Sequence, residues 1–342
     1  VMSHFDRPEG RVIQRMSLKP LLAPLMEALG GLRVVFVENC VGESAETSVK
    51  ALPEGGIALL ENLRFHAGEE ENDETFVQAL SVLGDVFVND AFSVAHRAHA
   101  STEGIAHVLP SAVGRAMQAE LEALEVALGN PDRPVLAVIG GAKVSTKLNV
   151  LSNLVGKVDR LAIGGAMANT FLYALGNDIG SSLCEKDMAD TARAVMKSAD
   201  QVGCQVILPS DVVISKKLEA GTPNETVPIT NVRPDTMILD IGTETALALA
   251  SCLESCKTVL WNGPLGAFEI RPFGEGTKIV ARAAAKLTTE SKLCSVAGGG
   301  DTIAALAAAD VVNDFSYIST AGGAFLEWLE GKELPGITAL YG

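Results

Sequence analysis

Short apolar runs alternate with amphipathic helical patterns along the whole chain, and this alternation restricts the fold more than any other feature. Strands that alternate with helices form βαβ units, in which the strands are parallel and helices cover both faces of the sheet. The runs expected to form strands are residues 33–37, 57–61, 85–89, 135–139, 160–163, 205–208, 237–240, 258–261, 293–297 and 316–318. We therefore predict an α/β fold of doubly wound, Rossmann-like parallel sheets.

A long amphipathic helical pattern divides the chain into two parts. Residues 115–129 carry Leu121, Leu124 and Leu128 on one stripe, and the turn-forming sequence Gly-Asn-Pro-Asp-Arg-Pro follows over residues 129–134. A chain of 342 residues is long enough for about two domains. The predicted organisation is a first domain over 1–114, a linking helix and hinge over 115–133, a second domain over 134–329 and a tail over 330–342 that returns towards the first domain. Shorter helices are expected over 18–29 and over 74–83, the latter capped by Asn72 or Asp73.

Charge and cysteine usage narrow the possible partners and the compartment. The chain has 27 basic and 42 acidic residues, a formal net charge of −15, which argues against an extended surface for nucleic acid or an anionic membrane. No apolar run approaches the roughly 20 residues of a membrane-spanning helix. Six scattered cysteines without a C-x-x-C pair favour free thiols in a reducing compartment over disulfides or metal sites, so a cytoplasmic location is expected. The first residues resemble the end of a strand, and we expect a segment upstream of them.

Glycines follow four apolar runs of the second half, at the point where a helical pattern begins. A glycine there lets the backbone approach a ligand, and a helix N-terminus offers free N–H groups to an anion. Tight turns alone are the competing interpretation. No P-loop and no G-x-G-x-x-G after a strand is present, so a nucleotide site would be of another design. The four glycine groups are Gly140-Gly141, Gly164-Gly165, Gly298-Gly299-Gly300 and Gly322-Gly323.

Two lysines and one acidic residue accompany these glycines. Lys143 and Lys147 are four residues apart, which predicts that they lie on one face of the first turns of a helix. Two cations at a helix N-terminus are electrostatically unfavourable unless an anion lies between them, so the pair indicates an anion site. Asp301 follows the three glycines and could hold Mg²⁺ at a phosphate site, with Thr302 donating its hydroxyl. The alternatives are a solvated lysine pair and an Asp301 that only caps a helix.

The loop after residues 258–261 adds two further polar groups. Glu269 could accept hydrogen bonds from ribose hydroxyls, and Asn262 could reach a phosphate. A plain surface loop is the alternative interpretation, because the segment is rich in glycine and proline.

Positive charge gathers differently in the first third of the chain. All five histidines precede residue 108, and three predicted strand ends each carry an arginine close to a histidine. Arginine pairs bidentately with carboxylate or phosphate, so these segments together predict a pocket for a small anionic substrate. Separate surface ion pairs are the alternative. The three segments are Ser3-His4-Phe5-Asp6-Arg7-Pro8, Glu61-Asn62-Leu63-Arg64-Phe65 and residues 90–99, which include His96 and Arg97.

The two halves together predict a phosphotransferase. A basic substrate pocket in one domain and a glycine-rich nucleotide and Mg²⁺ site in the other, joined by a hinge, suit an enzyme that closes to expel water and align donor with acceptor. The ordered motifs SH-x-x-RP, ENLRF, DAF-x-x-AHRAHAST, GGAKVSTK, WNGPLGAFE, AGGGDT and STAGGAFLEWLEGK closely resemble the phosphoglycerate kinase family, from the first residue to the last.

The resemblance implies a typically monomeric, hinge-bending, cytosolic glycolytic transferase that moves phosphate reversibly between 1,3-bisphosphoglycerate and ADP, giving 3-phosphoglycerate and MgATP. It implies that Lys143 stabilises the phosphoryl group in flight and that Lys147 contacts nucleotide phosphate, with Gly299 beside them as a catalytic group. The residues that would bind phosphoglycerate are His4, Phe5, Asp6, Arg7, Arg64, His96 and Arg97. Those that would bind nucleotide are Gly141, Lys147, Gly165, Asn262, Glu269, Gly298, Gly299, Gly300, Asp301 and Thr302, with Asp301 also holding Mg²⁺ through the nucleotide.

Some positions depart from the family pattern. Asp6 stands at a usual glycine, which puts a carboxylate beside the expected anion site, and Ser93, Ala166 and Ala321 replace other glycines. The family's opening strand unit and its R-x-D-x-N-x-P motif are not in this sequence. A catalytically impaired fragment or relative that only binds Mg-nucleotide is therefore the alternative function, and a less stable first domain is expected.

Overall fold

The computed structural model describes residues 1–341, which divide into two compact units. Unit 1 comprises Val1–Gln118 together with the described residues from Glu333 onward, and unit 2 comprises Ala119–Lys332. The division falls within helix α5 (Arg115–Leu124), which a π-helical segment, Glu125–Gly129, extends. The helix expected over 115–129 is thus present over its whole length.

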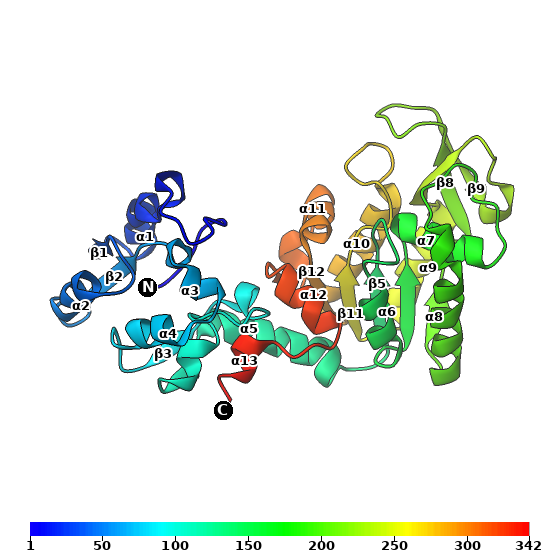
Figure 1. Cartoon of the computed structure of the whole chain (residues 1–342). Helices are drawn as coiled ribbons and strands as arrows, with labels where there is room; N and C mark the ends of the chain where they lie inside the picture. Colours follow the sequence, from blue (N-terminus) through cyan, green and yellow to red (C-terminus); the bar gives the residue numbers. More distant parts are fainter. Residues whose placement is uncertain (342) are drawn as a thin grey trace. The chain divides into compact units, whose positions relative to one another are not determined.

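A six-stranded parallel sheet forms the centre of unit 2 (Figure 1). Its strand order is β13-β12-β11-β5-β6-β7, so the chain starts in the middle of the sheet and builds outward on both sides of β5. Every neighbouring pair is parallel, which confirms the predicted α/β class. The strands are β5 (Val135–Ile139), β6 (Arg160–Ile163), β7 (Gln205–Ile207), β11 (Thr258–Asn262), β12 (Cys294–Gly298) and β13 (Tyr317–Ser319).

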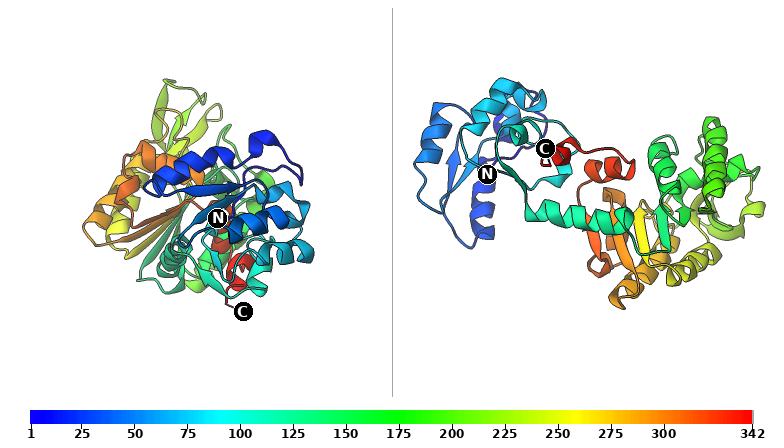
Figure 2. Two further views of the ribbon diagram at one scale, coloured as in Figure 1. Left: turned by 90° about the vertical axis from the view of Figure 1, so that its left-hand side faces the viewer. Right: turned by 90° about the horizontal axis from the view of Figure 1, so that it is seen from below.

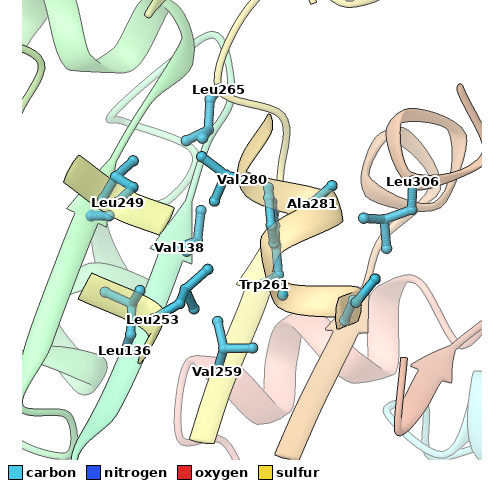
Figure 3. Packing of buried hydrophobic residues seen from close by; sticks show 14 of the residues in the cluster. Leu136, Val138, Leu249, Leu253, Val259, Trp261, Leu265, Val280, Ala281 and Leu306 are labelled. Atoms are coloured by element: carbon cyan, nitrogen blue, oxygen red, sulfur yellow. The ribbon is translucent and has the colours of Figure 1, made fainter. Parts of the chain in front are cut away.

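Helices cover both faces of this sheet, because alternate side chains of its strands point to opposite sides. On one face, Val138 of β5 and Trp261 of β11 are buried against α9, α10 and α11, as Figure 3 shows. Each fully buried aliphatic side chain of this kind contributes about 1.5–3 kcal/mol. On the other face, α6 packs against α8 and α12. The helices of unit 2 are α6 (Leu148–Val155), α7 (Gly165–Ala174), α8 (Ala189–Val202), α9 (Thr243–Glu254), α10 (Glu275–Thr289), α11 (Gly300–Ala308) and α12 (Gly323–Leu329).

A second, antiparallel sheet in unit 2 corrects one expectation. The run at 237–240 was expected to continue the parallel series, but β10 (Met237–Ile241) pairs antiparallel with β8 (Asp211–Ser215). β8 in turn pairs antiparallel with β9 (Asn224–Pro228). An apolar run predicts a strand but not the strand with which it pairs. Here a loop over residues 216–223 connects β8 and β9, which pair as an antiparallel hairpin.

Unit 1 holds four short strands in two separate ladders rather than one sheet. β1 (Val34–Val37) pairs parallel with β2 (Ile57–Leu60), and β3 (Phe87–Asn89) pairs parallel with β4 (Ser111–Val113). An apolar cavity of about 450 Å³ is lined by residues of β2 and β3 together with Val1. The Val1 backbone hydrogen-bonds along β2, its amino group donating to Ala58 and its carbonyl accepting from Leu60.

The helices of unit 1 agree in part with the predictions. The helix expected over 18–29 is α-helical only over α1 (Leu22–Ala28), after a 3-10 turn over Lys19–Leu21, because Pro24 has no N–H and is tolerated only in the first turn of an α-helix. Asp73 caps α4 (Glu74–Ser81) by accepting a hydrogen bond from the Phe76 amide at 2.9 Å. Two further helices, α2 (Glu43–Lys50) and α3 (Ala67–Glu70), were not expected.

The end of the chain belongs to unit 1. In α13 (Pro335–Thr338), the Gly336 amide donates to the Ala95 carbonyl at 2.9 Å, and the Asn89 side chain donates to the Gly336 carbonyl at 3.2 Å. Figure 2 shows this red segment beside the cyan elements of unit 1. Within residues 1–341, no helix is both long enough and apolar enough to cross a bilayer.

Candidate active site

In two of the glycine turns of unit 2, Gly140-Gly141 and Gly298-Gly299-Gly300, the first and the last glycine have different surroundings. The first glycine packs against the protein: a Cβ on Gly140 would overlap the Pro264 carbonyl, and one on Gly298 would lie 2.6 Å from the Phe325 ring. The later glycine faces open space, since nothing lies within 4 Å of a Cβ built on Gly300 and only Met167 within 4 Å of one on Gly141. Tight packing and an open backbone surface are therefore both present, one residue or two apart.

Lys143 and Lys147 lie in the turn before α6, not on the helix as the spacing predicted. α6 begins at Leu148, and the Lys147 amide closes a turn onto the Val144 carbonyl at 2.9 Å. The Thr146 hydroxyl bonds the Lys143 carbonyl, and Ser145 bonds Glu185 through both its amide and its hydroxyl. Such side-chain bonds compete with helical hydrogen bonds, which explains the later helix start.

Lys147 is the better fixed of the two lysines. Its Nζ donates to Oδ1 of Asn262, which is 2% exposed at the end of β11, while Nδ2 of Asn262 donates to the Gly298 carbonyl at 2.7 Å. Burial lowers the pKa of Lys147, although the nearby carboxylates of Asp301 and Glu330 act in the opposite direction. Lys143 is exposed. A half-buried cation is thus held between two of the glycine turns.

The start of α11 presents backbone N–H groups next to a carboxylate. Gly299 has a φ of +100°, a conformation that favours glycine, and precedes the first residue of the helix, Gly300. The Thr302 hydroxyl, predicted to donate to phosphate, instead donates to the Gly298 carbonyl and accepts from the Gly263 amide. Asp301 is exposed in the first turn. The groups of this helix terminus that could contact an anion are therefore its backbone N–H groups, together with a cation bound by Asp301.

A cavity of about 330 Å³ opens beside these turns. Gly141, Gly165, Glu269 and Asp301, all predicted site residues, line it. Its other wall is apolar and includes Leu218, Met237 and Leu239 from around the antiparallel sheet. Sequence reasoning missed this wall, because the segments that form it carry no polar motif and their partners are far away in the chain.

Asp240 is a further group that sequence reasoning missed. It is 2% exposed in the wall of the cavity, and its two carboxylate oxygens accept from the amides of Ile241 and Gly276 at 2.9 Å each. Burial raises the pKa of Asp240 to about 7. This carboxyl therefore ties β10 to the start of α10 beside the cavity.

In unit 1, buried side chains hold the segment that carries His4 and Arg7. Asn62 is 1% exposed and donates to the carbonyls of Phe5 at 2.8 Å and Met16 at 2.9 Å. Arg64, 4% exposed, donates to the Asp6 carbonyl at 3.0 Å. Asn62 was part of a quoted motif without a role, and the structure gives it this positioning role.

Several predicted substrate residues share one electrostatic environment. Burial and the nearby charges of Arg64, His99 and Arg97 lower the pKa of His4 to about 4. The Arg97 Nε contacts the His96 ring at 3.3 Å. The buried Nε of Arg64 forms an ion pair with Oε1 of Glu70 at 3.5 Å but makes no hydrogen bond within the described residues. The cluster brings together His4, Arg64, His96 and Arg97, whereas Phe5, Asp6 and Arg7 are exposed on the adjacent segment.

Asp6 has a left-handed backbone conformation of the kind that glycine favours. Its φ is +58°, in the left-handed region, where aspartate is one of the few tolerated side chains. Its Oδ1 accepts from the Arg7 amide at 2.9 Å. The turn beside His4 and Arg7 is therefore formed, but it carries a carboxylate.

No group of three or more His, Cys, Asp or Glu side chains that could hold a metal ion occurs within residues 1–341.

The fold and these two sites define a two-unit α/β phosphotransferase, with a cationic cluster in one unit and glycine turns at the carboxyl edge of a parallel sheet in the other. Residues 1–332 match the family described as phosphoglycerate kinase, and the chain belongs to that family.

Relatives and solved structures agree with the family match. The phosphoglycerate kinase of Rhodospirillum centenum is 58% identical over 340 residues, 99% of this chain and 86% of that protein. The one from Caulobacter vibrioides is 56% identical with the same coverage. The solved structure of phosphoglycerate kinase from Coxiella burnetii has a TM-score of 0.91 at 40% identity, covering 99% of this chain and 85% of that one. The Pyrococcus horikoshii enzyme has a TM-score of 0.78 at 32% identity.

The function is therefore that of a glycolytic kinase. It transfers a phosphoryl group reversibly between 1,3-bisphosphoglycerate and ADP, giving 3-phosphoglycerate and ATP. No finding favours the alternative of a relative that only binds nucleotide.

Proposed function

We propose that the cationic cluster of unit 1 binds phosphoglycerate and that the glycine turns of unit 2 bind the nucleotide and neutralise the transferred phosphoryl group. The observation that carries this proposal is the half-buried Lys147, which Asn262 holds through a hydrogen bond while the same Asn262 side chain donates to Gly298 of a glycine turn. Phosphoryl transfer needs positioning and charge neutralisation more than a covalent nucleophile, and these groups supply both.

In unit 1, the substrate's phosphate and carboxylate oxygens are proposed to lie against His4, Arg64 and Arg97, with His96 supporting Arg97. The buried Nε of Arg64 supports this assignment, since it makes an ion pair with Glu70 at 3.5 Å but no hydrogen bond within the described residues, and an anionic ligand would satisfy this donor. Arg7 lies beside the cluster on an exposed segment and would close onto the ligand. Phe5 and Asp6 provide the backbone of that segment.

In unit 2, the apolar wall of the cavity is proposed to take the planar base, with Glu269 accepting from ribose hydroxyls. The phosphates would extend towards the backbone N–H groups of Gly299, Gly300 and Asp301 at the start of α11. Gly141 and Gly165 line the cavity and allow the ligand a close approach. Asn262, Gly298 and Thr302 hold these turns in place through the hydrogen bonds described above.

The two lysines are proposed to act on the phosphates. Lys147, fixed by Asn262, would contact the nucleotide phosphates, and the exposed Lys143 would contact the phosphoryl group in flight. Their charges are worth most where water is excluded, since electrostatic stabilisation grows as the local dielectric constant falls.

One carboxylate together with nucleotide phosphates is a set of ligands that suits Mg²⁺, which keeps several waters and needs no all-protein cage. Asp301 fits that role, because it is exposed at the edge of the cavity and next to the N–H groups that would face the phosphates. Bound there, Mg²⁺ would neutralise phosphate charge. The enzyme is further proposed to act as a monomer in the cytoplasm, where its free cysteines stay reduced.

The test is a coupled assay of ATP formation from ADP and 1,3-bisphosphoglycerate, in which the kcat of Lys147→Met is compared with those of Lys147→Arg and the wild type. Removing a preorganised cation should lower kcat by about 10²–10³-fold, and Lys147→Arg should retain part of the rate. Calorimetry with Arg97→Ala should show weaker 3-phosphoglycerate binding and unchanged ADP binding. A Lys147→Met enzyme with an unchanged kcat, or an Arg97→Ala enzyme with unchanged 3-phosphoglycerate affinity, would overturn the assignment of that site.

A further inference from the structure

Two thiols and one guanidinium group gather at a place that the kinase reaction does not use. Cys252 lies in the last turn of α9, Cys256 follows two residues after the helix ends, and Arg160 begins β6. Nη1 of Arg160 is 3.4 Å from the Sγ atoms of both cysteines. The same nitrogen donates to the Ser255 hydroxyl at 2.6 Å and to the Cys252 carbonyl at 3.3 Å, so the guanidinium is held in place by the chain around it.

This cluster is far from the nucleotide site along the strands that connect them. Arg160 stands at the amino end of β6, and Cys256 shortly precedes the amino end of β11. The glycine turns and Asn262 stand at the carboxyl ends of the same strands. In a parallel sheet these are opposite edges, so the thiols are a separate feature of unit 2 and not part of the active site.

A cation next to a thiol stabilises the thiolate, which is the reactive form of cysteine. Hydrogen bonding from the Cys256 thiol, followed by the charge and the hydrogen bond of Arg160, lowers the pKa of Cys252, although burial acts in the opposite direction. In the same arrangement the pKa of Cys256 is raised. Arg160 and Cys256 are the titratable groups that face Cys252, and only the first carries a charge at neutral pH.

The other cysteines lie in environments that protect the thiol form. Burial raises the pKa of each of them, and Cys40 and Cys204 are inaccessible as well. Cys184 and Cys294 are half-buried, as Cys252 is, but have no arginine at the sulfur among the hydrogen bonds of the described residues. They are therefore internal controls for a half-buried thiol without an arginine at the sulfur.

We propose that Cys252 is an oxidant-sensitive modification site, at which Arg160 stabilises the thiolate for attack on a hydroperoxide. In this step the Cys252 sulfur forms a bond to the terminal peroxide oxygen while the O–O bond breaks. The sulfur loses two electrons and becomes a sulfenic acid, and the peroxide is reduced, its second oxygen leaving as hydroxide or alkoxide that takes up a proton. Cys252 is the first cysteine of this chain to be modified by peroxides and other small electrophiles.

The first experiment measures alkylation of the intact protein by iodoacetamide between pH 5 and 9, with every cysteine followed by peptide mass spectrometry. Cys252 should show a midpoint at least about one unit below the ordinary thiol value of about 8.5. One unit increases the thiolate about tenfold at neutral pH but lowers its nucleophilicity about threefold, so Cys252 should react at least about threefold faster than Cys294 at pH 7. A midpoint at or above the ordinary value, or faster labelling of Cys184 or Cys294, would overturn the proposal.

Two variants separate the arginine from the surrounding fold. Arg160→Gln should slow the labelling of Cys252 about threefold or more and raise the pH midpoint of that labelling. Arg160→Lys should restore part of the labelling rate and part of the lowered midpoint. Unchanged labelling of Cys184 and Cys294 in the same samples shows that the fold is kept. Cys252 labelling that is equal in wild type and Arg160→Gln contradicts the role of Arg160.

The oxidation step is tested with hydrogen peroxide and a dimedone probe, which labels sulfenic acids. Labelling should be concentrated at Cys252, absent in Cys252→Ser, and weaker in Arg160→Gln. Cys252→Ser should keep the kinase activity of the wild type, because the cluster is at the opposite edge of the sheet from the active site. Dimedone labelling spread evenly over the accessible cysteines would contradict the proposal.

Discussion

Unit 1 and unit 2 are both α/β structures, but they are held together differently. Unit 2 has one parallel sheet of six strands, and a cluster of 21 buried residues packs against one of its faces. Unit 1 has two ladders of two strands and a cluster of 12 buried residues, with an apolar cavity bordered by β2 and β3. Since buried apolar area is the main source of stability, unit 2 has the larger share of it.

The binding groups that we propose for the two units also differ. In unit 1 they are the charged side chains of His4, Arg64 and Arg97, whose attraction for an anion depends on pH and salt. In unit 2 they are mainly backbone groups, at turns where glycines allow close approach and where Lys147 and Asp301 add single charges. The two proposed sites would thus attract anions in two ways: through side-chain charge on a small scaffold, and through backbone geometry on a large one.

The largest effect is expected from a backbone change in unit 2. Gly140→Ala should destabilise the protein by about 3 kcal/mol or more, because the new Cβ would overlap the Pro264 carbonyl, a backbone atom that cannot rotate away. Gly300→Ala is the matched control and should change stability by less than about 0.5 kcal/mol, since nothing lies near its Cβ. Urea unfolding of both variants measures this. Equal effects would mean that packed glycines such as Gly140 and open glycines such as Gly300 do not differ in their roles as described.

The second prediction concerns the relative stability of the units. The slowest amides of β5 and β11 should exchange at least about 100-fold more slowly than those of β2 and β3, which corresponds to about 2.7 kcal/mol. The physical reason is the larger buried core around the six-stranded sheet. Native-state hydrogen exchange with mass spectrometry makes the measurement. Equally slow exchange in both units would contradict the comparison of their cores.

The third prediction tests the charge at the edge of the unit 1 cluster. Asp6→Gly should relieve a left-handed aspartate and remove a carboxylate, lowering the KM for 3-phosphoglycerate about 3–10-fold, or by about 1 kcal/mol. Asp6→Asn tolerates the same φ and removes only the charge. A similar gain in both variants assigns the effect to electrostatics, whereas no gain in either shows that Asp6 does not oppose the anion.

The fourth and smallest effect is a pH dependence of opposite sign in the two units. The pKa of His4 is lowered to about 4 in unit 1, against about 6.5 in an unfolded chain. The unfolded state therefore binds the additional proton between these values, and unit 1 loses stability as the pH falls from about 6.5 to about 4. The pKa of Asp240 is raised to about 7, so unit 2 keeps that contribution at low pH and loses it as the pH rises through 7.

Hydrogen exchange of each unit at pH 5 and pH 8 measures how the stability of each unit changes with pH. His4→Gln should remove the part of the stability loss of unit 1 at low pH that is due to His4, and should leave the stability of unit 2 unchanged. Added 3-phosphoglycerate should raise the pKa of His4, because a bound anion favours the protonated ring. A His4 titration by NMR that is unmoved by the ligand would place the substrate elsewhere.

The central strands could be predicted because they are buried on both faces and read as continuous apolar runs. β5 and β11 are of this kind. β4 and β9, by contrast, are short or polar, and β10 has an apolar run whose antiparallel partner is set by tertiary contacts. The charged members of the site could be predicted from residue type, as with Lys147 and Arg64. The hydrogen bonds of the Thr302 hydroxyl with the backbone of Gly298 and Gly263 could not be predicted, because they depend on which turns the sheet brings together.

The hydrogen bonds that tie Asn89 and Ala95 to Gly336 have a consequence for the order of events during synthesis. Unit 2 is one uninterrupted stretch, so its whole chain is available once Lys332 has left the ribosome. Unit 1 is discontinuous and includes residues on both sides of unit 2 in the sequence. Unit 1 is therefore begun before unit 2 and completed after it, and a chain cut off after residue 332 would contain all of unit 2 but would lack part of unit 1.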